Sequence, residues 1–276
     1  MTLILLAVLA QAGAQEASID ARIAAFIRGD AGARDAVMKA GPSAIAPLRK
    51  AREKAPGKVD SLVFEIKKAA AWPRNPEAAT AMQVSVKMSL QNATVDVALQ
   101  YMAELGSVQF VNLTGGKPDL KSVACSIETA DSFAWDILDG ICRTAGVDYG
   151  FFHGVVVIAT PEKLWGGRMG AAAMERQTLT EAEGTLKKQL THIKLDFDFQ
   201  NQRIGDMLDY LKEFCGVKIE VDEAVKGSMD LKFKGLRFFD ALALMTQGMD
   251  CDYILQGDKF FVGTSEAIGK KIGDKK

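Results

Sequence analysis

The chain has 276 residues, which is long enough for two or three small domains. Its hydrophobic content of 48% and charged content of 25% are ordinary for a folded soluble protein. The formal net charge of −1 argues against a broad phosphate-binding surface, so nucleic acid is not an expected partner.

A signal peptide is predicted over residues 1–14. Residues 3–10 form a short apolar run, and Ala12-Gly13-Ala14 follows as a small-residue cleavage site, with cleavage expected near Ala14. No positively charged residue precedes the run, and the alternative interpretation is a buried N-terminal helix. Export would place the mature protein in the periplasm or otherwise outside the cytoplasm. No other apolar run is long enough to serve as a transmembrane anchor.

Residues 17–72 are predicted to form a small all-helical region. Apolar residues recur at helical spacing in four short stretches, which are interrupted at Asp30, Gly41-Pro42 and Pro56-Gly57. Ser43 is the expected N-cap of the third helix, because its hydroxyl can accept a hydrogen bond from the first turn. Short amphipathic helices joined by such turns indicate packing as helical hairpins.

One stretch of this region resembles a HEAT repeat, in which a small-residue turn leads into a helix carrying Pro-Leu. It runs from Phe26-Ile27-Arg28-Gly29-Asp30 to Pro47-Leu48. The resemblance covers about one and a half units, whereas a stable solenoid needs about three. It therefore implies a small helical cap or docking module. Two prolines within residues 72–76 then predict a linker.

The rest of the chain contains an internal repeat. Residues 84–91 alternate apolar and polar, which predicts a strand with one buried face, and apolar residues then recur at helical spacing as far as Leu105. The same pattern recurs 109 residues later and ends at Phe214. Both copies carry Gln-Asn at the point where the strand alternation gives way to helical spacing, and we expect a turn there.

Each copy continues with a short strand, a third strand, a second helix and a terminal hairpin. The copies are expected to span 82–160 and 191–264. Between them, residues 161–190 are predicted to be a glycine-containing linker followed by one helix over 171–190. Residues 265–276 are expected to be a loose tail. The predicted fold class is therefore α+β, with a small all-α region followed by two tandem βαββαββ units.

This pattern resembles the short N-terminal domain of secretins and TonB-dependent receptors, over residues 82–160 and 191–264. The matching positions are Asn92, Val95, Leu99, Tyr101, Glu104 and His153-Gly154 in the first copy, and Asn201, Ile204, Leu208, Tyr210, Glu213, Gly216-Val217 and Gly257-Asp258 in the second. The resemblance implies a periplasmic interaction domain with two helices packed on small sheets. No barrel or pore region follows in this sequence, so we do not expect the chain to be a channel or receptor itself.

Exposed strand edges are the expected partner-docking sites, because unpaired edges accept an added strand. The terminal strands of the two copies are the first candidates, and the first strand of each copy is the alternative. The candidate docking residues on the terminal strands are Val155, Val157, Lys259, Phe260 and Phe261.

The sequence predicts no catalytic, cofactor or metal site. His153 and His192 are too few for a histidine-rich metal centre. Asp196 and Asp198 would lie about 7 Å apart on one strand face, a spacing suited to acid/base catalysis, although solvated strand-face charges are the preferred interpretation. The cysteines allow either one disulfide per copy or buried free thiols, and they are Cys125, Cys142, Cys215 and Cys251.

The leading hypothesis is an exported, non-enzymatic envelope protein that binds protein partners, among which secretin or transport machinery is a candidate. The alternative is a small-ligand or peptidoglycan-binding module with a groove between the two copies. A third hypothesis is an enzyme that uses Asp196 and Asp198.

Overall fold

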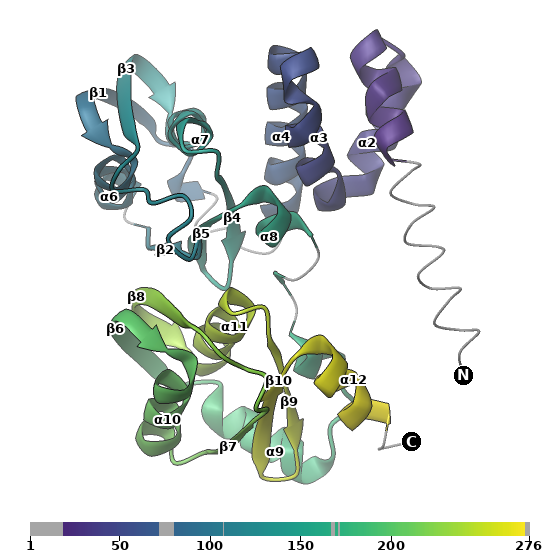
Figure 1. The fold of residues 1–276 in the computed structure, drawn as a ribbon, viewed down its shortest axis with the longest axis vertical. Helices are drawn as coiled ribbons and strands as arrows, with labels where there is room; N and C mark the ends of the chain where they lie inside the picture. The colour runs from purple at the N-terminus through teal and green to yellow at the C-terminus, as the bar shows by residue number, and fades with distance from the viewer. Residues whose placement is uncertain (1–18, 72–79, 107, 167–168, 171, 274–276) are drawn as a thin grey trace.

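The computed structural model describes residues 19–71, 80–106, 108–166, 169–170 and 172–273. The predicted signal peptide and the prolines of 72–76 lie outside these ranges. The fold is mixed α/β, with helices first and small sheets with intervening helices after them (Figure 1). Within the described ranges, no helix combines the length and apolarity needed to cross a bilayer.

The helical region contains the four expected helices. They are residues 19–28, α2 (Ala31–Ala40), α3 (Ile45–Ala51) and α4 (Pro56–Ala71). The Asp30 carboxylate caps α2 by accepting the Gly32 N–H at 3.0 Å. The prediction for Ser43 is wrong, because a 3₁₀ turn over Gly41–Ala44 leads straight into α3, and no side chain caps that helix. The Ser43 hydroxyl donates to the Ala40 carbonyl within that turn.

The first α/β unit has two sheets. Strand β1 pairs with β3 antiparallel, and the second sheet has the order β2-β5-β4, in which β2 is parallel to β5. Its elements are β1 (Ser85–Thr94), α6 (Val95–Gly106), β2 (Phe110–Asn112), β3 (Ala124–Phe133), α7 (Ala134–Thr144), β4 (Asp148–Phe152) and β5 (Val155–Ala159).

The second α/β unit repeats this order and these pairings. Strand β6 pairs with β8, and the other sheet has the order β7-β10-β9. Its elements are β6 (Lys194–Arg203), α10 (Ile204–Cys215), β7 (Lys218–Val221), β8 (Ser228–Arg237), α11 (Phe238–Gly248), β9 (Asp252–Gln256) and β10 (Lys259–Gly263). The two units therefore agree with the repeat seen in the sequence, element by element.

The repeated asparagine marks a bulge, not the end of the strand. Asn92 has φ 53° and Asn201 has φ 46°, and each lies at a register shift in the pairing of β1 or β6. Both strands continue past it to Thr94 and Arg203. Asparagine tolerates left-handed backbone better than most residues, which explains why both copies carry it at this point.

The connecting segment and the tail differ from the prediction. The single helix expected over 171–190 is divided into a 3₁₀ turn (Ala173–Arg176) and α9 (Glu181–Leu190), because Thr180 and Glu183 form a capping box that starts a new helix. A short helix, α8 (Pro161–Trp165), precedes them. The expected loose tail instead contains α12 (Ser265–Gly273), which buries Ile268 against the second unit.

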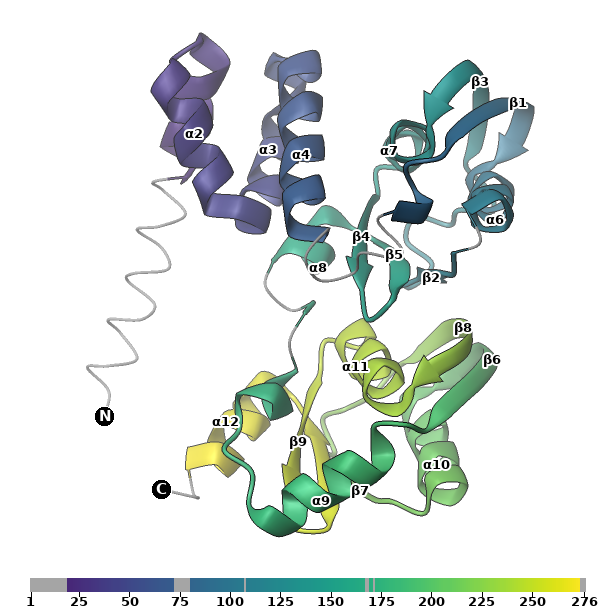
Figure 2. The same ribbon diagram turned by 180° about the vertical axis from the view of Figure 1, so that it is seen from behind.

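The three parts contact one another in chain order. The helical region lies beside the first unit, and the second unit packs against the other end of the first (Figures 1 and 2). Seen from behind in Figure 2, α9 runs along the second unit, and α12 contacts β9 and β10.

Candidate functional site

The terminal strands named as docking edges are not edges, which corrects the sequence-based prediction. Strand β5, with Val155 and Val157, lies between β2 and β4. Strand β10, with Lys259, Phe260 and Phe261, lies between β7 and β9. The final strand of each unit returns to the middle of its sheet because it pairs in parallel with the short second strand. A partner strand cannot add at a central strand.

Both faces of these central strands are also buried. Val156 and Ile158 belong to the core of the first unit, whereas Val155 and Val157 belong to the cluster that includes Trp165 of α8. In the second unit, Phe261 packs against Ile268 of α12. Four of the five predicted docking residues therefore serve packing between elements, and the fifth, Lys259, forms a partly exposed ion pair with Glu220.

Two further edges are engaged by side-chain amides. The Gln177 side chain accepts the Leu255 N–H at 2.9 Å and donates to the Leu255 carbonyl at 3.3 Å, on the edge strand β9. The Gln109 side chain pairs in the same way with the backbone of Lys234 in β8, at 2.6 and 2.7 Å. At each point the amide takes the hydrogen bonds that an added strand would otherwise make.

The first strands, β1 and β6, remain as candidate docking edges. Each belongs to a two-stranded sheet and pairs with only one other strand in the described part of the chain. Strand β6 is flanked by an aromatic surface, since the Tyr210 ring lies 5.3 Å from that of Phe197 and 5.8 Å from that of Phe199. Phe214 stacks on Tyr210 at 5.7 Å and is 59% exposed.

The first unit presents an equivalent but less aromatic surface on α6. Val97, Tyr101 and Leu105 recur every four residues and are all exposed. Tyr101 corresponds to Tyr210, and Leu105 corresponds to Phe214. Leu105 and Phe214 end the run of apolar residues at helical spacing in the two copies, and both are exposed. The helices turn them outward because Met102 and Leu211 already fill the core at the neighbouring positions. An exposed apolar helix face next to an edge strand is unusual unless it binds something.

An ionic cluster holds the helical region on the first unit. Lys67 of α4 forms an ion pair and a close hydrogen bond with Asp148 at the start of β4, and both side chains are almost fully buried. Arg49 of α3 contacts Asp139 at 2.6 Å and Asp148 at 3.4 Å. The indole of Trp165 donates to the other oxygen of Asp148 at 3.0 Å. Burial raises the pKa of Asp148, but Lys67 and Arg49 outweigh burial and hold it below its ordinary value.

Asp60 extends the cluster to the surface. It accepts from Arg49 at 3.0 Å, from Arg52 at 2.9 Å and from Arg143 of α7 at 2.6 Å. The neighbouring contact is apolar, with the rings of Phe64 and Trp135 edge to face at 5.6 Å. Sequence reasoning missed this cluster because its members lie far apart in the chain, and no local pattern marks them.

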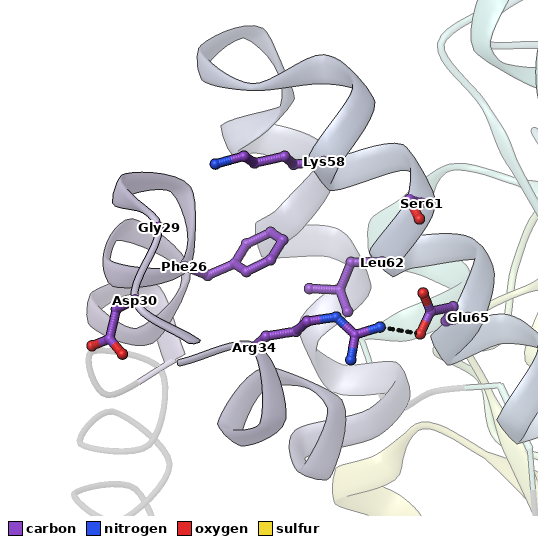
Figure 3. Close-up of a pocket in the computed structure, with 8 residues that line it drawn as sticks. All are labelled: Phe26, Gly29, Asp30, Arg34, Lys58, Ser61, Leu62 and Glu65. Carbon is purple, nitrogen blue, oxygen red and sulfur yellow. Dashed lines mark hydrogen bonds and ion pairs between the residues drawn. The ribbon is translucent and has the colours of Figure 1, made fainter. Parts of the chain in front are cut away.

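A groove of about 310 Å³ opens between the helices of the N-terminal region (Figure 3). Phe26 and Leu62 form its apolar floor, and Arg34 of α2 pairs with Glu65 of α4 across it at 2.5 Å. The pair is partly exposed and joins the two helical hairpins, so its role is structural. Lys58 and Asp30 at the rim carry opposite charges, and the groove shows no preference for one sign of ligand.

Contacts within the fold account for three of the polar residues considered for catalysis or metal binding, namely Asp196, Asp198 and His153. The Asp196 carboxylate accepts the Gly235 N–H at 2.6 Å, and Asp198 pairs with Lys232 at 2.8 Å, both on the exposed face of the β6–β8 sheet. His153 forms the β4–β5 turn with φ 53° and contacts Gln247 and Asp240 of the second unit. His192 is exposed. All four cysteines are free thiols, so the alternative of one disulfide per copy is not formed.

In the described ranges, no three histidine, cysteine or acidic side chains are grouped so that they could hold a metal ion. Comparison of the chain with family models and with curated proteins finds no match. Inferences about function therefore depend on the surfaces of the molecule.

Proposed function

We propose that this chain is a non-enzymatic interaction protein that captures a partner by strand addition at β6 and β1. The observation that carries the proposal is the exposed aromatic pair Tyr210 and Phe214 beside the outer strand β6. Its recurrence on α6 beside β1 supports the same role for the first unit.

The two units are proposed to be domains of the secretin and TonB-receptor N-terminal type, preceded by a HEAT-like helical region. Their shared order of strands and helices supports this assignment. The apolar run at 3–10, followed by small residues, supports export to the cell envelope. The proposed partner is an envelope protein, and a secretion or transport assembly is a candidate.

Strand addition suits this surface physically. The backbone groups on the outer edge of β6 would supply hydrogen bonds that do not depend on sequence, and the aromatic pair would supply an anchor for one apolar side chain. Tyrosine and phenylalanine provide large contact areas with little loss of rotamer freedom. The two units carry different side chains on this surface, so we expect them to differ in specificity.

Site-specific photocrosslinking in intact cells tests the proposal. A photoreactive phenylalanine at Phe214 is expected to form an adduct with an envelope protein, and one at the exposed Glu223 of the same unit serves as the control. Hydrogen exchange of the purified complex is then expected to show protection of β6 (Lys194–Arg203) on binding. Equal adducts at both positions, or protection that avoids β1 and β6, would contradict strand addition.

A further inference from the structure

A small cavity lies where α4 meets β4 and α8, away from the β1 and β6 edges. Its volume is about 170 Å³. Tyr149 and Phe152 of β4 and Trp165 of α8 form its aromatic walls, and Ser43 and Ala70 of the helical region form part of its rim. The cavity is therefore built by three segments that are distant in sequence.

The equivalent place in the second unit has a different lining, and among the described residues no second aromatic ring faces Phe261 there. There Ile254 and Ile268 pack with Phe261 and Ala173 in a small buried cluster. The first unit has Gly150 in the place of Ile254. A side chain at Gly150 would come within 2.4 Å of the Phe152 ring and 3.0 Å of the Trp165 ring. Glycine thus lets the two rings approach the strand, where they are tilted by 48° and 5.7 Å apart.

One end of the cavity is polar. Lys67 lines it, and the lysine ammonium lies 3.8 Å from the centre of the Tyr149 ring. The charge of Lys67 is already balanced by Asp148, and the charge of nearby Arg49 by Asp139. An anionic ligand would add an unbalanced charge to a buried site, and a cationic one would be repelled by Lys67.

We propose that this cavity binds an uncharged molecule with a single aromatic ring and one hydrogen-bond acceptor, of the size of benzamide. A cavity of about 150 Å³ is known to be enough for one benzene ring. The three aromatic walls allow edge-to-face and offset contacts with such a ring. The acceptor would face the Lys67 ammonium. This site goes beyond the proposed strand addition and does not depend on it.

The probe for the test is 4-fluorobenzamide, titrated into the full chain and followed by ¹⁹F NMR. Ala70→Phe and Ser43→Phe fill the cavity from two sides of its rim, and each should weaken binding by about tenfold or more. Ala69→Phe is the matched control, because Ala69 is exposed on the same helix and is not part of the lining. It should leave the affinity unchanged. Benzoate and benzylamine should compete less well than benzamide, by about tenfold.

A second measurement uses the native chain and needs no cavity-filling substitution. The Trp165 indole N–H, which donates to Asp148, gives its own NMR signal, and we expect benzamide to shift this signal and not that of Trp135. The proposal is overturned if the native chain shows no saturable binding, if the Trp165 signal stays unmoved, or if folded Ala70→Phe and Ser43→Phe both bind as the native chain does.

Discussion

Asp148 is the residue that ties the helical region to the first unit. Its side chain is 0% exposed, and it receives hydrogen bonds from Lys67, Trp165 and its own neighbour Tyr149. Asp252 begins the equivalent strand β9 and accepts the Ala173 N–H, and its cation is the exposed Arg176, 4.0 Å away. The aspartate at this position of the repeat therefore joins each unit to the segment before it. In the first unit it does so mainly through a buried ion pair, and in the second through a backbone N–H.

Asp148→Asn is expected to lower the free energy of unfolding by about 3–5 kcal/mol, because the buried Lys67 would lose its closest counter-charge. Urea denaturation measures the loss. Asp198→Asn, on an exposed strand face, is the control and should change stability by about 0.5 kcal/mol or less. Similar values for the two variants would show that the cluster does not stabilise the contact.

The same residue should make stability depend on pH. The folded pKa of Asp148 lies below its unfolded value, so its contribution is present above the unfolded pKa of about 3.9 and is lost as pH falls through the folded pKa. Melting temperatures measured from pH 6 downward should therefore fall more steeply for the native chain than for Asp148→Asn. Parallel curves would mean that Asp148 is not the titrating group.

Asn201 shows how one residue fixes a strand. Its left-handed backbone forms the bulge in β6, and its side chain accepts from the Ser228 hydroxyl at 2.6 Å. Asn201→Ala should cost about 1–2 kcal/mol, because alanine keeps a Cβ in the left-handed conformation but lacks the polar side chain that helps asparagine to adopt it and that binds Ser228. Asn201→Gly removes the same hydrogen bond without the backbone penalty and should cost less. Thermal unfolding of both variants gives the comparison, and equal losses would place the effect in the hydrogen bond alone.

At the scale of elements, local pattern was enough to find the strands and the helices of the repeat and of the N-terminal region, but not to order the strands. Alternation marked β1 and β6, and helical spacing marked α2, α3 and α4. The central positions of β5 and β10 arise from parallel pairing with β2 and β7, across about forty residues of chain. The ionic cluster was not predicted for a related reason, since Lys67 and Asp148 are 81 positions apart and meet only where the helical region packs on the first unit.

The helix α12 was not predicted because its sequence is rich in Lys and Gly and a single residue, Ile268, makes its buried apolar contact. Ile268 is 4% exposed and covers Phe261, whereas Ile272 on the same helix is 37% exposed. Ile268→Ala should destabilise the second unit by about 2–4 kcal/mol, and Ile272→Ala should cost about 1 kcal/mol or less. Chemical denaturation of the two variants measures the difference. Equal small losses would mean that the segment is a loose tail after all.

At the scale of the molecule, each part docks on the second helix of the part that follows. The helical region contacts α7 of the first unit through Asp60 and Arg143. The first unit contacts α11 of the second through His153 and Gln247, residues 94 positions apart. The helical region lies beside the first unit and the second unit lies below it, and the β1 and β6 edges are left outside both junctions (Figures 1 and 2). Direct hydrogen bonds cross the junction where the alternative hypothesis placed a ligand-binding groove.

A substitution of Gln109 tests the contact between the two units, because the Gln109 side chain makes two hydrogen bonds to the backbone of Lys234 across their junction. Gln109→Ala should leave each unit folded but weaken the junction by about 1–2 kcal/mol. Hydrogen exchange should then be faster for the Lys234 amide, with little change at β9 and β10. Gln100→Ala is the matched control, since Gln100 bonds only locally to Asp96 on α6 and should leave exchange at Lys234 unaltered. If Gln109→Ala also leaves the Lys234 amide unaltered, the units are held by their apolar contacts, and the amide pairing contributes nothing to their arrangement.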